Sequence, residues 1–319
     1  MQDVAIPQAR LSSSGPFTLG TAQLGLPNYG RANTTGRPER GEAIALVSKA
    51  VERGIDCIDT ARGYQLAEAV VGEALKPFGD RVRVVTKLDP LEELPANAPP
   101  AQVRQAVDAS VFRSCRELGR AALPILLLHR WQHRTSHQGL VWQRLIELRG
   151  DGAIGQLGTS VSTPAEALAA LGDPEIRQLQ LPFNLLDHRW RMAGIDRRAV
   201  ERSDVVIHAR SALLQGLLAA PPSVWPRLPG VSAEKTVAQL EQLALRLGRA
   251  NRLDLSLSFV RAQPWIHSLV LGVETVAQLV DLLRWFERPP LSAAECAEVW
   301  QSISEVPEIL LNPALWPGK

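Results

Sequence analysis

Short apolar runs alternate along the chain with stretches in which apolar residues recur every three or four positions. The short runs are rich in β-branched residues and apolar throughout, which is typical of parallel strands covered by helices on both faces. We predict eight strands, at residues 17–22, 54–61, 82–88, 123–129, 153–160, 177–183, 205–211 and 266–273.

The stretches between these runs predict amphipathic helices. One begins near a proline pair and ends at Gly119, and another has Thr163 as a cap-like residue before Pro164 at the first helical position. Eight strands with helical crossovers favour an α/β fold of the (β/α)8 TIM barrel class. A doubly wound sheet is the alternative, but residues 20–30 do not lead directly into a helix as its first glycine-rich turn would.

The domain organisation is expected to be simple, because no repeat, low-complexity segment or linker interrupts the 319 residues. We expect a single domain over residues 1–319. Its barrel core would cover about 17–286, and a C-terminal helical extension would cover about 287–319.

Composition narrows the partners and the compartment. Lys and Arg number 35 and Asp and Glu 33, and the net charge of +2 gives no reason to expect a nucleic-acid partner. Residues 1–15 lack the basic-then-apolar order of a signal peptide, and no apolar run approaches the ~20 residues that span a bilayer. The 3 cysteines form no close pair, which favours a reducing compartment. We expect a cytoplasmic protein with a small-molecule substrate and no membrane partner, as a monomer or weak homo-oligomer.

Polar residues follow three successive strands at the end where such barrels carry their chemistry. Asp59 ends the second predicted strand, and Tyr64 follows it after a short interval. Lys87 ends the third strand and His129 the fourth. Neighbouring strands lie ~5 Å apart, so these four side chains can meet at one point.

Their chemistry suits proton donation to an oxygen. Tyrosine alone has a pKa of ~10, and a lysine cation at ~4 Å with an effective dielectric of ~20 would favour phenolate by ~4 kcal/mol, against an opposing desolvation cost. We expect Lys87 to bring the pKa of Tyr64 toward neutrality while Asp59 keeps Lys87 protonated. His129 would orient the substrate oxygen. Carbonyl reduction by hydride needs such a donor, and it requires a nicotinamide.

Seven segments resemble the aldo-keto reductase family in sequence and order, between about Phe17 and Phe286: LGTAQLG, DTARGY, VTKLD, LLLHR, LGTSVSTPAE, LQLPFNLLD and SALLQGLL. The resemblance implies a TIM barrel, no metal, and NADP(H) or NAD(H) across the barrel mouth. It implies reversible reduction of aldehydes or ketones, with sugar-derived or otherwise polar carbonyl compounds as candidate substrates. It places the catalytic tetrad on Asp59, Tyr64, Lys87 and His129.

The resemblance also implies a cofactor site, with two departures. Val161 stands where an asparagine is expected beside Ser160, and either one hydrogen bond to the nicotinamide amide is missing or water or Asn184 takes its place. Arg210 stands where an aromatic residue stacks on the nicotinamide. Arg210 would repel the positive oxidised ring and so favour the reduced cofactor, or it pairs with an acid or a substrate anion. The expected cofactor-binding residues are Gly20, Thr21, Asp59, Ser160, Gln180, Arg210, Ser211, Leu213, Gln215, Gly272, Glu274 and Gln278.

Cofactor choice stays open between NADH and NADPH. No basic residue occurs at 272–278, where the 2′-phosphate of NADP(H) is expected, and Glu274 would repel it. This favours NAD(H), whereas the family favours NADP(H). Arg246, Arg249 and Arg252 are alternative phosphate ligands.

The loop at 130–139 carries several basic residues. His129, His133 and His137 are spaced by four, but His129 ends a strand and no carboxylate or cysteine joins them in the loop, so no metal is expected. A basic mouth would suit anionic or hydroxyl-rich substrates. Arg130 and Trp131 are the expected substrate-pocket residues.

Other interpretations stay open. Taken singly, Asp59 and Lys87 fit a structural ion pair, and His129 fits a core histidine. The chain could be a nicotinamide-binding auxiliary or regulatory subunit with little turnover. A barrel isomerase or aldolase would use Lys87 as a base or Schiff-base former.

Overall fold

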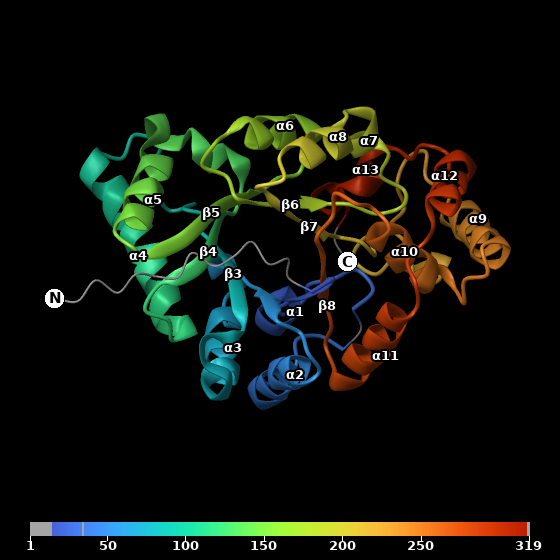
Figure 1. Cartoon of the computed structure of the whole chain (residues 1–319), viewed down its shortest axis with the longest axis horizontal. Coiled ribbons are helices and arrows are strands. Elements are labelled where there is room, and N and C mark those ends of the chain that lie inside the picture. Colours follow the sequence, from blue (N-terminus) through green and yellow to red (C-terminus); the bar gives the residue numbers. More distant parts are fainter. Residues whose placement is uncertain (1–14, 34, 318–319) are drawn as a thin grey trace.

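The computed structural model describes residues 15–33 and 35–317. Eight parallel strands close into a barrel in sequence order, with β1 pairing with β8 (Figure 1). The strands are β1 (Phe17–Gly20), β2 (Cys57–Asp59), β3 (Arg83–Lys87), β4 (Leu123–Leu128), β5 (Ile154–Ser160), β6 (Gln178–Pro182), β7 (Val206–Arg210) and β8 (Ser268–Gly272). Each lies within one predicted run, so the TIM barrel is confirmed and the doubly wound sheet is excluded.

Helices surround the strands (Figure 1). The α-helices are α1 (Ala22–Gly25), α2 (Arg40–Glu52), α3 (Ala67–Leu75), α4 (Pro100–Leu118), α5 (Leu140–Gly150), α6 (Pro164–Gly172), α7 (Arg189–Met192), α8 (Ile195–Glu201), α9 (Ala233–Arg246), α10 (Arg252–Arg261), α11 (Val276–Glu287), α12 (Ala293–Ser302) and α13 (Glu308–Leu311). The 3₁₀ helices are η1 (Arg62–Tyr64), η2 (Lys76–Arg81), η3 (Trp131–Arg134), η4 (Ser136–Gly139), η5 (Pro222–Val224) and η6 (Pro313–Leu315).

Local chemistry sets several helix ends. Thr163 Oγ1 accepts from the Glu166 N–H at 3.3 Å in a capping box, with Pro164 at the first helical position as predicted. Helix α4 ends at Gly119, whose φ of 65° lies in the left-handed region. Both predicted helix signals are confirmed.

Helix α1 corrects one sequence-based expectation, since residues 20–30 do begin with a helical turn directly after β1. Its single turn packs on the loop that carries Tyr64. A Cβ at Gly25 would come within 1.8 Å of the Tyr64 carbonyl oxygen, so only glycine fits there. The first connection therefore supports the candidate site from one side.

The barrel interior is apolar in part and polar in part. Cys57, Val85, Ile125 and Leu127 form a buried cluster inside it. Successive strand residues point to opposite faces, so the residue two positions after Cys57 also points inward, which is Asp59. The same alternation carries Val85 on β3 to Lys87 and thus aims both charges at the barrel mouth.

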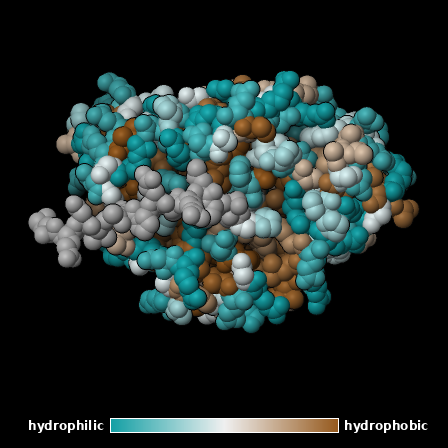
Figure 2. Space-filling model, viewed as in Figure 1, coloured by the Kyte–Doolittle hydropathy of each residue, from teal (hydrophilic) through white to brown (hydrophobic). Residues whose placement is uncertain are grey.

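Figure 2 shows a face that is mostly hydrophilic, with hydrophobic residues toward its centre. No helix in the described ranges is long and apolar enough to cross a membrane. Cys57 and Cys115 are buried and free. The signal-peptide prediction concerned residues 1–15, of which 1–14 lie outside the described residues, as do 318–319 of the predicted extension.

Candidate active site

A buried ion pair joins the carboxyl ends of β2 and β3. Lys87 Nζ donates to Asp59 Oδ1 at 2.7 Å, to Asp59 Oδ2 at 2.8 Å and to the Thr60 carbonyl at 3.0 Å. Gln180 Nε2 donates to Asp59 Oδ2 at 2.7 Å. Asp59 is 3% exposed and Lys87 1%, so each charge depends on the other for compensation. All three ammonium protons have acceptors.

Tyr64 lies over this pair on η1. The Lys87 ammonium is 5.1 Å from the centroid of the Tyr64 ring, within cation–π range. The Tyr64 ring meets the His129 ring nearly at right angles, with centroids 5.8 Å apart. The structure thus brings together the four side chains predicted from sequence, whose catalytic roles remain predictions.

The expected effect of Lys87 on the acidity of Tyr64 is wrong. Burial raises the pKa of Tyr64 above its ordinary value, the Asp59 carboxylate raises it further, and the Arg210 cation lowers it. Asp59 offsets the field of Lys87, because the two charges are in direct contact. Tyr64 consequently keeps its proton at neutral pH.

His129 is a neutral imidazole. Burial, and then the charges of Lys87 and Arg130, lower its pKa to about 3. Its Nδ1 is buried and has no hydrogen-bond partner among the described residues. A proton there would leave a buried donor unsatisfied at a cost of ~1–3 kcal/mol, so we assign the proton to Nε2. That N–H is the group that can donate to a substrate oxygen.

The end of β1 supports Asp59 and approaches β8 closely. The Thr21 N–H and Oγ1 both donate to the Asp59 carbonyl at 3.0 Å. Gly20 pairs with Gly272 across the β1–β8 junction. A Cβ at Gly272 would come within 2.0 Å of the Gln23 side chain, so glycine lets this amide lie against the end of β8.

Arg210 spans the mouth from β7 to β5. Its Nη2 donates to the Val161 carbonyl at 3.1 Å and to Ser162 Oγ at 3.3 Å. No carboxylate pairs with Arg210 within residues 15–33 and 35–317, so the predicted pairing with an acid is not seen. Ser160, next to Val161, is buried at the end of β5. Neutral acceptors hold the guanidinium, so no carboxylate in the described residues offsets its positive charge.

The turn after β7 has an unusual backbone. Ser211, Leu214 and Gln215 have positive φ values of 58°, 47° and 53°, and Leu213 lies between them. Such values are uncommon outside glycine and often mark functional turns. The Gln215 carbonyl accepts from the Ala32 N–H at 3.2 Å, which docks the β1–α2 connection on this turn.

Asn184 is engaged in local structure near the same turn. Its Oδ1 accepts from the Leu186 N–H at 3.0 Å, and its Nδ2 donates to the Ser211 carbonyl at 3.5 Å. Sequence alone left open that Asn184 supplies the amide missing at Val161. These two bonds give that amide a structural use instead.

The start of α11 holds the last predicted cofactor residues. Gln278 Oε1 accepts from the Glu274 N–H at 2.8 Å, and Thr275 Oγ1 accepts from the Gln278 N–H at 3.1 Å. These bonds satisfy helix N-terminal donors. Thr275 is therefore the N-cap of α11, and the Gln278 side chain binds the backbone of the residue before it.

The three alternative phosphate ligands contact other parts of the fold. Arg246 Nε donates to Glu298 of α12 at 3.2 Å. Arg249 donates to the Pro289 carbonyl at 2.8 Å. Arg252 donates to successive carbonyls of the β7–α9 connection, the nearest at 3.0 Å. All three thus have structural partners.

The basic loop after β4 is largely neutralised. Arg130 pairs with Glu92 at 2.8 Å on the exposed rim, and Arg134 pairs with Asp173 at 2.6 Å. Trp131 is partly buried and packs against the core. No group of three or more possible metal-ligating side chains occurs in the described parts of the chain.

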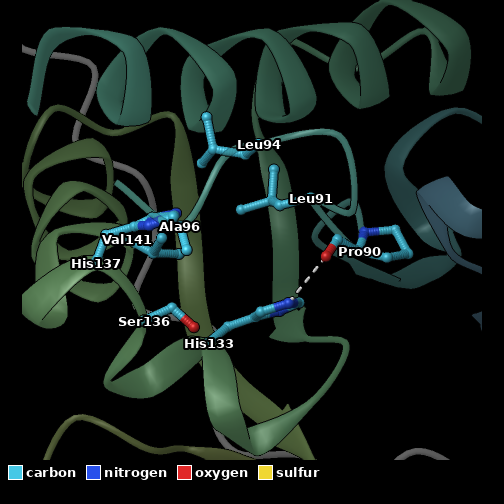
Figure 3. Close-up of a pocket in the computed structure, with 8 residues that line it drawn as sticks. All are labelled: Pro90, Leu91, Leu94, Ala96, His133, Ser136, His137 and Val141. Carbon is cyan, nitrogen blue, oxygen red and sulfur yellow. Dashed lines mark hydrogen bonds between the residues drawn. The ribbon is translucent and has the colours of Figure 1, made fainter. Parts of the chain in front are cut away.

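A pocket of about 360 Å³ lies between the connections that follow β3 and β4 (Figure 3). His133 Nε2 donates to the Pro90 carbonyl at 3.0 Å across its floor. Pro90 also approaches Gly63, where a Cβ would be 3.3 Å from Pro90 and 3.2 Å from His129. The pocket therefore adjoins the tetrad. Its lining is Pro90, Leu91, Leu94, Ala96, His133, Ser136, His137 and Val141.

Comparison with known proteins identifies the family. The family model described as "Aldo/keto reductase family" matches residues 16–304. The chain belongs to the aldo-keto reductase family. Members of this family carry out NAD(P)-dependent oxidoreductase chemistry on carbonyl groups, and this is the general activity that the sequence pattern predicted.

Individual relatives of this aldo-keto reductase are distant. The chain is 28% identical to pyridoxine 4-dehydrogenase of Escherichia coli, over 58% of this chain and 68% of the relative. It is 26% identical to protein Tas of Escherichia coli, over 88% of this chain and 91% of the relative. The holo form of aldo-keto reductase AKR11C1 from Bacillus halodurans has the same fold, with a TM-score of 0.71, 20% identity, and coverage of 92% and 93%.

Sequence reasoning missed Tyr29 in this aldo-keto reductase. Burial and the nearby Tyr64 raise the pKa of Tyr29 to about 12, while Arg210 lowers it. These influences place the second phenol beside the tetrad. A usable signal existed, because Tyr29 is the only other tyrosine and lies in the connection that leaves the carboxyl end of β1.

Proposed function

We propose that this aldo-keto reductase reduces an aldehyde or ketone to an alcohol with Tyr64 as the general acid. The observation that carries the proposal is the buried Asp59–Lys87 pair beneath the Tyr64 ring, with neutral His129 edge-on to it. A bound nicotinamide supplies the hydride. Residues of this chain supply the proton and hold the carbonyl.

The proton comes from a phenol that stays protonated until it is needed. As negative charge grows on the carbonyl oxygen, Tyr64 gives its proton to that oxygen. His129 donates a hydrogen bond to the same oxygen. The Arg210 cation, which lowers the pKa of Tyr64, favours the phenolate left behind. The three hydrogen bonds of Lys87 argue against a Schiff-base role.

The residues at the ends of β5 to β7 fit a dinucleotide. Ser160, Gln180 and Arg210 face the mouth, and the turn of positive φ values at 211–215 can present backbone N–H groups to phosphate. Gly20, Thr21 and Gly272 would border it. Gln180 Nε2 already donates to Asp59, so Gln180 would hold the nicotinamide only through its remaining amide hydrogen-bonding groups.

We propose that NADH is preferred over NADPH. The structural contacts of Arg246, Arg249 and Arg252, and the position of Glu274 before α11, support this choice. Titration of tryptophan fluorescence with each reduced cofactor tests it without turnover. Tighter binding of NADPH than NADH by the wild type would overturn the preference, and Glu274→Lys is expected to strengthen NADPH binding selectively.

The substrate is proposed to be a neutral polar carbonyl compound. The Arg130–Glu92 and Arg134–Asp173 pairs leave the rim less basic than its sequence suggests. The relative named pyridoxine 4-dehydrogenase makes pyridoxal a reasonable member of a test panel. Sugar-derived aldehydes and simple aromatic aldehydes complete it.

The decisive experiment is a carbonyl panel run with the better-binding reduced cofactor. Turnover that is lost in Tyr64→Phe, with cofactor binding retained, supports the proposal. Cofactor binding without turnover on any compound would favour the auxiliary-subunit interpretation. Turnover that survives in Tyr64→Phe would overturn the role of Tyr64.

A further inference from the structure

Arg62 lies between Asp59 and Tyr64 in sequence, yet its side chain turns away from the mouth into the protein. It is 7% exposed. Its Nη1 contacts Glu68 Oε2 of α3 at 2.5 Å and Glu117 Oε2 of α4 at 2.7 Å. An arginine on a catalytic loop would ordinarily face solvent or substrate, and burial of this one requires the two carboxylates.

Glu68 connects this arginine to the strand that carries Lys87. Glu68 is fully buried, and its Oε1 accepts from Thr86 Oγ1 at 2.6 Å. Thr86 immediately precedes Lys87 on β3 and points to the opposite face of the strand. One carboxylate thus bonds to the loop of Tyr64 through Arg62 and to the strand of Lys87 through Thr86.

The loop itself needs such an anchor. Gln65, directly after Tyr64, has φ 49° and ψ −104°, a conformation that is costly for a residue with a side chain. Arg62 Nη2 donates to the Gln65 carbonyl at 3.4 Å, on the strained residue. Strain of this kind persists only where surrounding contacts hold the backbone.

We propose that Arg62 and Glu68 are positioning residues that fix the Tyr64 hydroxyl relative to Lys87 and His129. Neither touches the reacting atoms. Their ion pair, with the Glu117 carboxylate as a second negative charge beside Arg62, holds the turn at 61–65 so that the phenol stays over the ammonium. The proposal rests on the proposed function for its kinetic test but not for its structural one.

The kinetic test uses Arg62→Met with Glu68→Gln, which removes both charges together. Replacement of a buried ion pair by neutral residues is often tolerated, and Glu117 keeps Arg113 at 3.0 Å, so a folded protein is expected. Because ~1 Å of misplacement can cost about 100-fold, we expect kcat to fall by about 10- to 100-fold. KM and cofactor binding should change little. Arg62→Lys keeps the positive charge but not the forked geometry of the guanidinium. Its kcat should lie between those of the wild type and the double variant.

The control removes another Arg–Glu pair that also joins two helices. Arg104 and Glu147 connect α4 to α5 and are more exposed than Arg62 and Glu68. The variant Arg104→Met with Glu147→Gln should leave kcat unchanged. An equal loss in both double variants would indicate general destabilisation and overturn the proposal.

The structural test requires no substrate, because the chain has 2 tyrosines. In a Tyr29→Phe background labelled with fluorotyrosine, fluorine NMR reports Tyr64 alone. We expect one sharp signal that broadens or splits when Arg62 and Glu68 are replaced, and stays sharp in the Arg104 control. An unchanged signal would overturn positioning even if kcat falls. If the wild type shows no turnover, the proposed function fails while this measurement still decides the positioning role.

If the double variant does not fold, Glu68→Gln alone takes its place. It keeps a side chain that can accept from Thr86 while it removes the charge opposite Arg62. The expected changes are in the same direction and smaller. A folded Glu68→Gln protein with wild-type kcat and an unchanged fluorine signal would overturn the proposal.

Discussion

The two halves of the barrel mouth are built differently. In the proposed catalytic half, formed by Asp59, Tyr64, Lys87 and His129, side chains contact one another. The proposed cofactor half is formed by Ser160, Gln180, Arg210, Gly272 and Gln278. Its polar side chains contact backbone groups, as Arg210 does at Val161, or reach back, as Gln180 does to Asp59. A buried charge must find its partner inside the fold, whereas a polar group at the rim can be completed by a ligand. The first half should therefore be rigid before anything binds.

The largest expected effect is the loss of kcat when the Tyr64 phenol is removed. Tyr64→Phe removes the proposed general acid while leaving the proposed cofactor half untouched, so kcat should fall by about 10²- to 10⁴-fold. The dissociation constant of the reduced cofactor should be unchanged. Steady-state kinetics and fluorescence titration measure the two quantities separately. A weakened cofactor with unchanged kcat would show that the halves are not distinct.

Breaking the ion pair tests rigidity in the catalytic half. Lys87→Met leaves the Asp59 carboxylate buried with Gln180 as its remaining side-chain partner, and should lower the free energy of unfolding by about 3–5 kcal/mol. Urea unfolding measures this. The double variant Lys87→Met with Asp59→Asn removes both charges and should recover most of the loss. No recovery would mean that lost packing, rather than the unpaired charge, explains the defect.

The contrast also explains what sequence could predict. The sequence predicted the four tetrad residues because each lies at or shortly after the carboxyl end of a strand, and because together they suit proton donation to an oxygen: Asp59, Tyr64, Lys87 and His129. The pKa of Tyr64 was misjudged, because sequence gives no measure of burial or of how fully Asp59 offsets Lys87. Glu68 and Thr86 were missed for a related reason. In the sequence their partner Arg62 resembles an ordinary surface residue, and only the structure shows that carboxylates of α3 and α4 surround it.

Two histidines of lowered pKa, His129 at the mouth and His208 inside the barrel, can be tested by pH. His208 lies within the barrel two residues before Arg210 on β7, and burial lowers its pKa to about 3. An unfolded histidine has a pKa of ~6.5, so the unfolded state takes up the proton first and stability falls as pH drops from ~6.5 toward the folded value.

At ~1.36 kcal/mol per pH unit, His208 should account for about 2 kcal/mol of lost stability between pH ~6.5 and ~5. His208→Gln should flatten the dependence of unfolding free energy on pH over that window. His129→Gln should flatten it to a similar extent, because the folded pKa of His129 is also about 3 and lies below this window. A slope left unchanged by either substitution would contradict a folded pKa well below ~5 for that histidine.

The smallest expected effect concerns Arg210, which links the halves. Its cation is held by neutral acceptors just after β5 and lowers the pKa of Tyr64, so it should repel the positive oxidised nicotinamide and not the neutral reduced one. At the effective dielectric of a partly exposed site this amounts to about 1 kcal/mol, or about a fivefold preference for the reduced cofactor. Arg210→Phe should abolish the preference, and Arg210→Lys should retain it. Dissociation constants of both redox forms measure the ratio directly, and the ratio should shrink with added salt because solvent ions screen an exposed cation. An identical ratio in wild type and Arg210→Phe would leave the guanidinium a purely structural bridge from β7 to Val161.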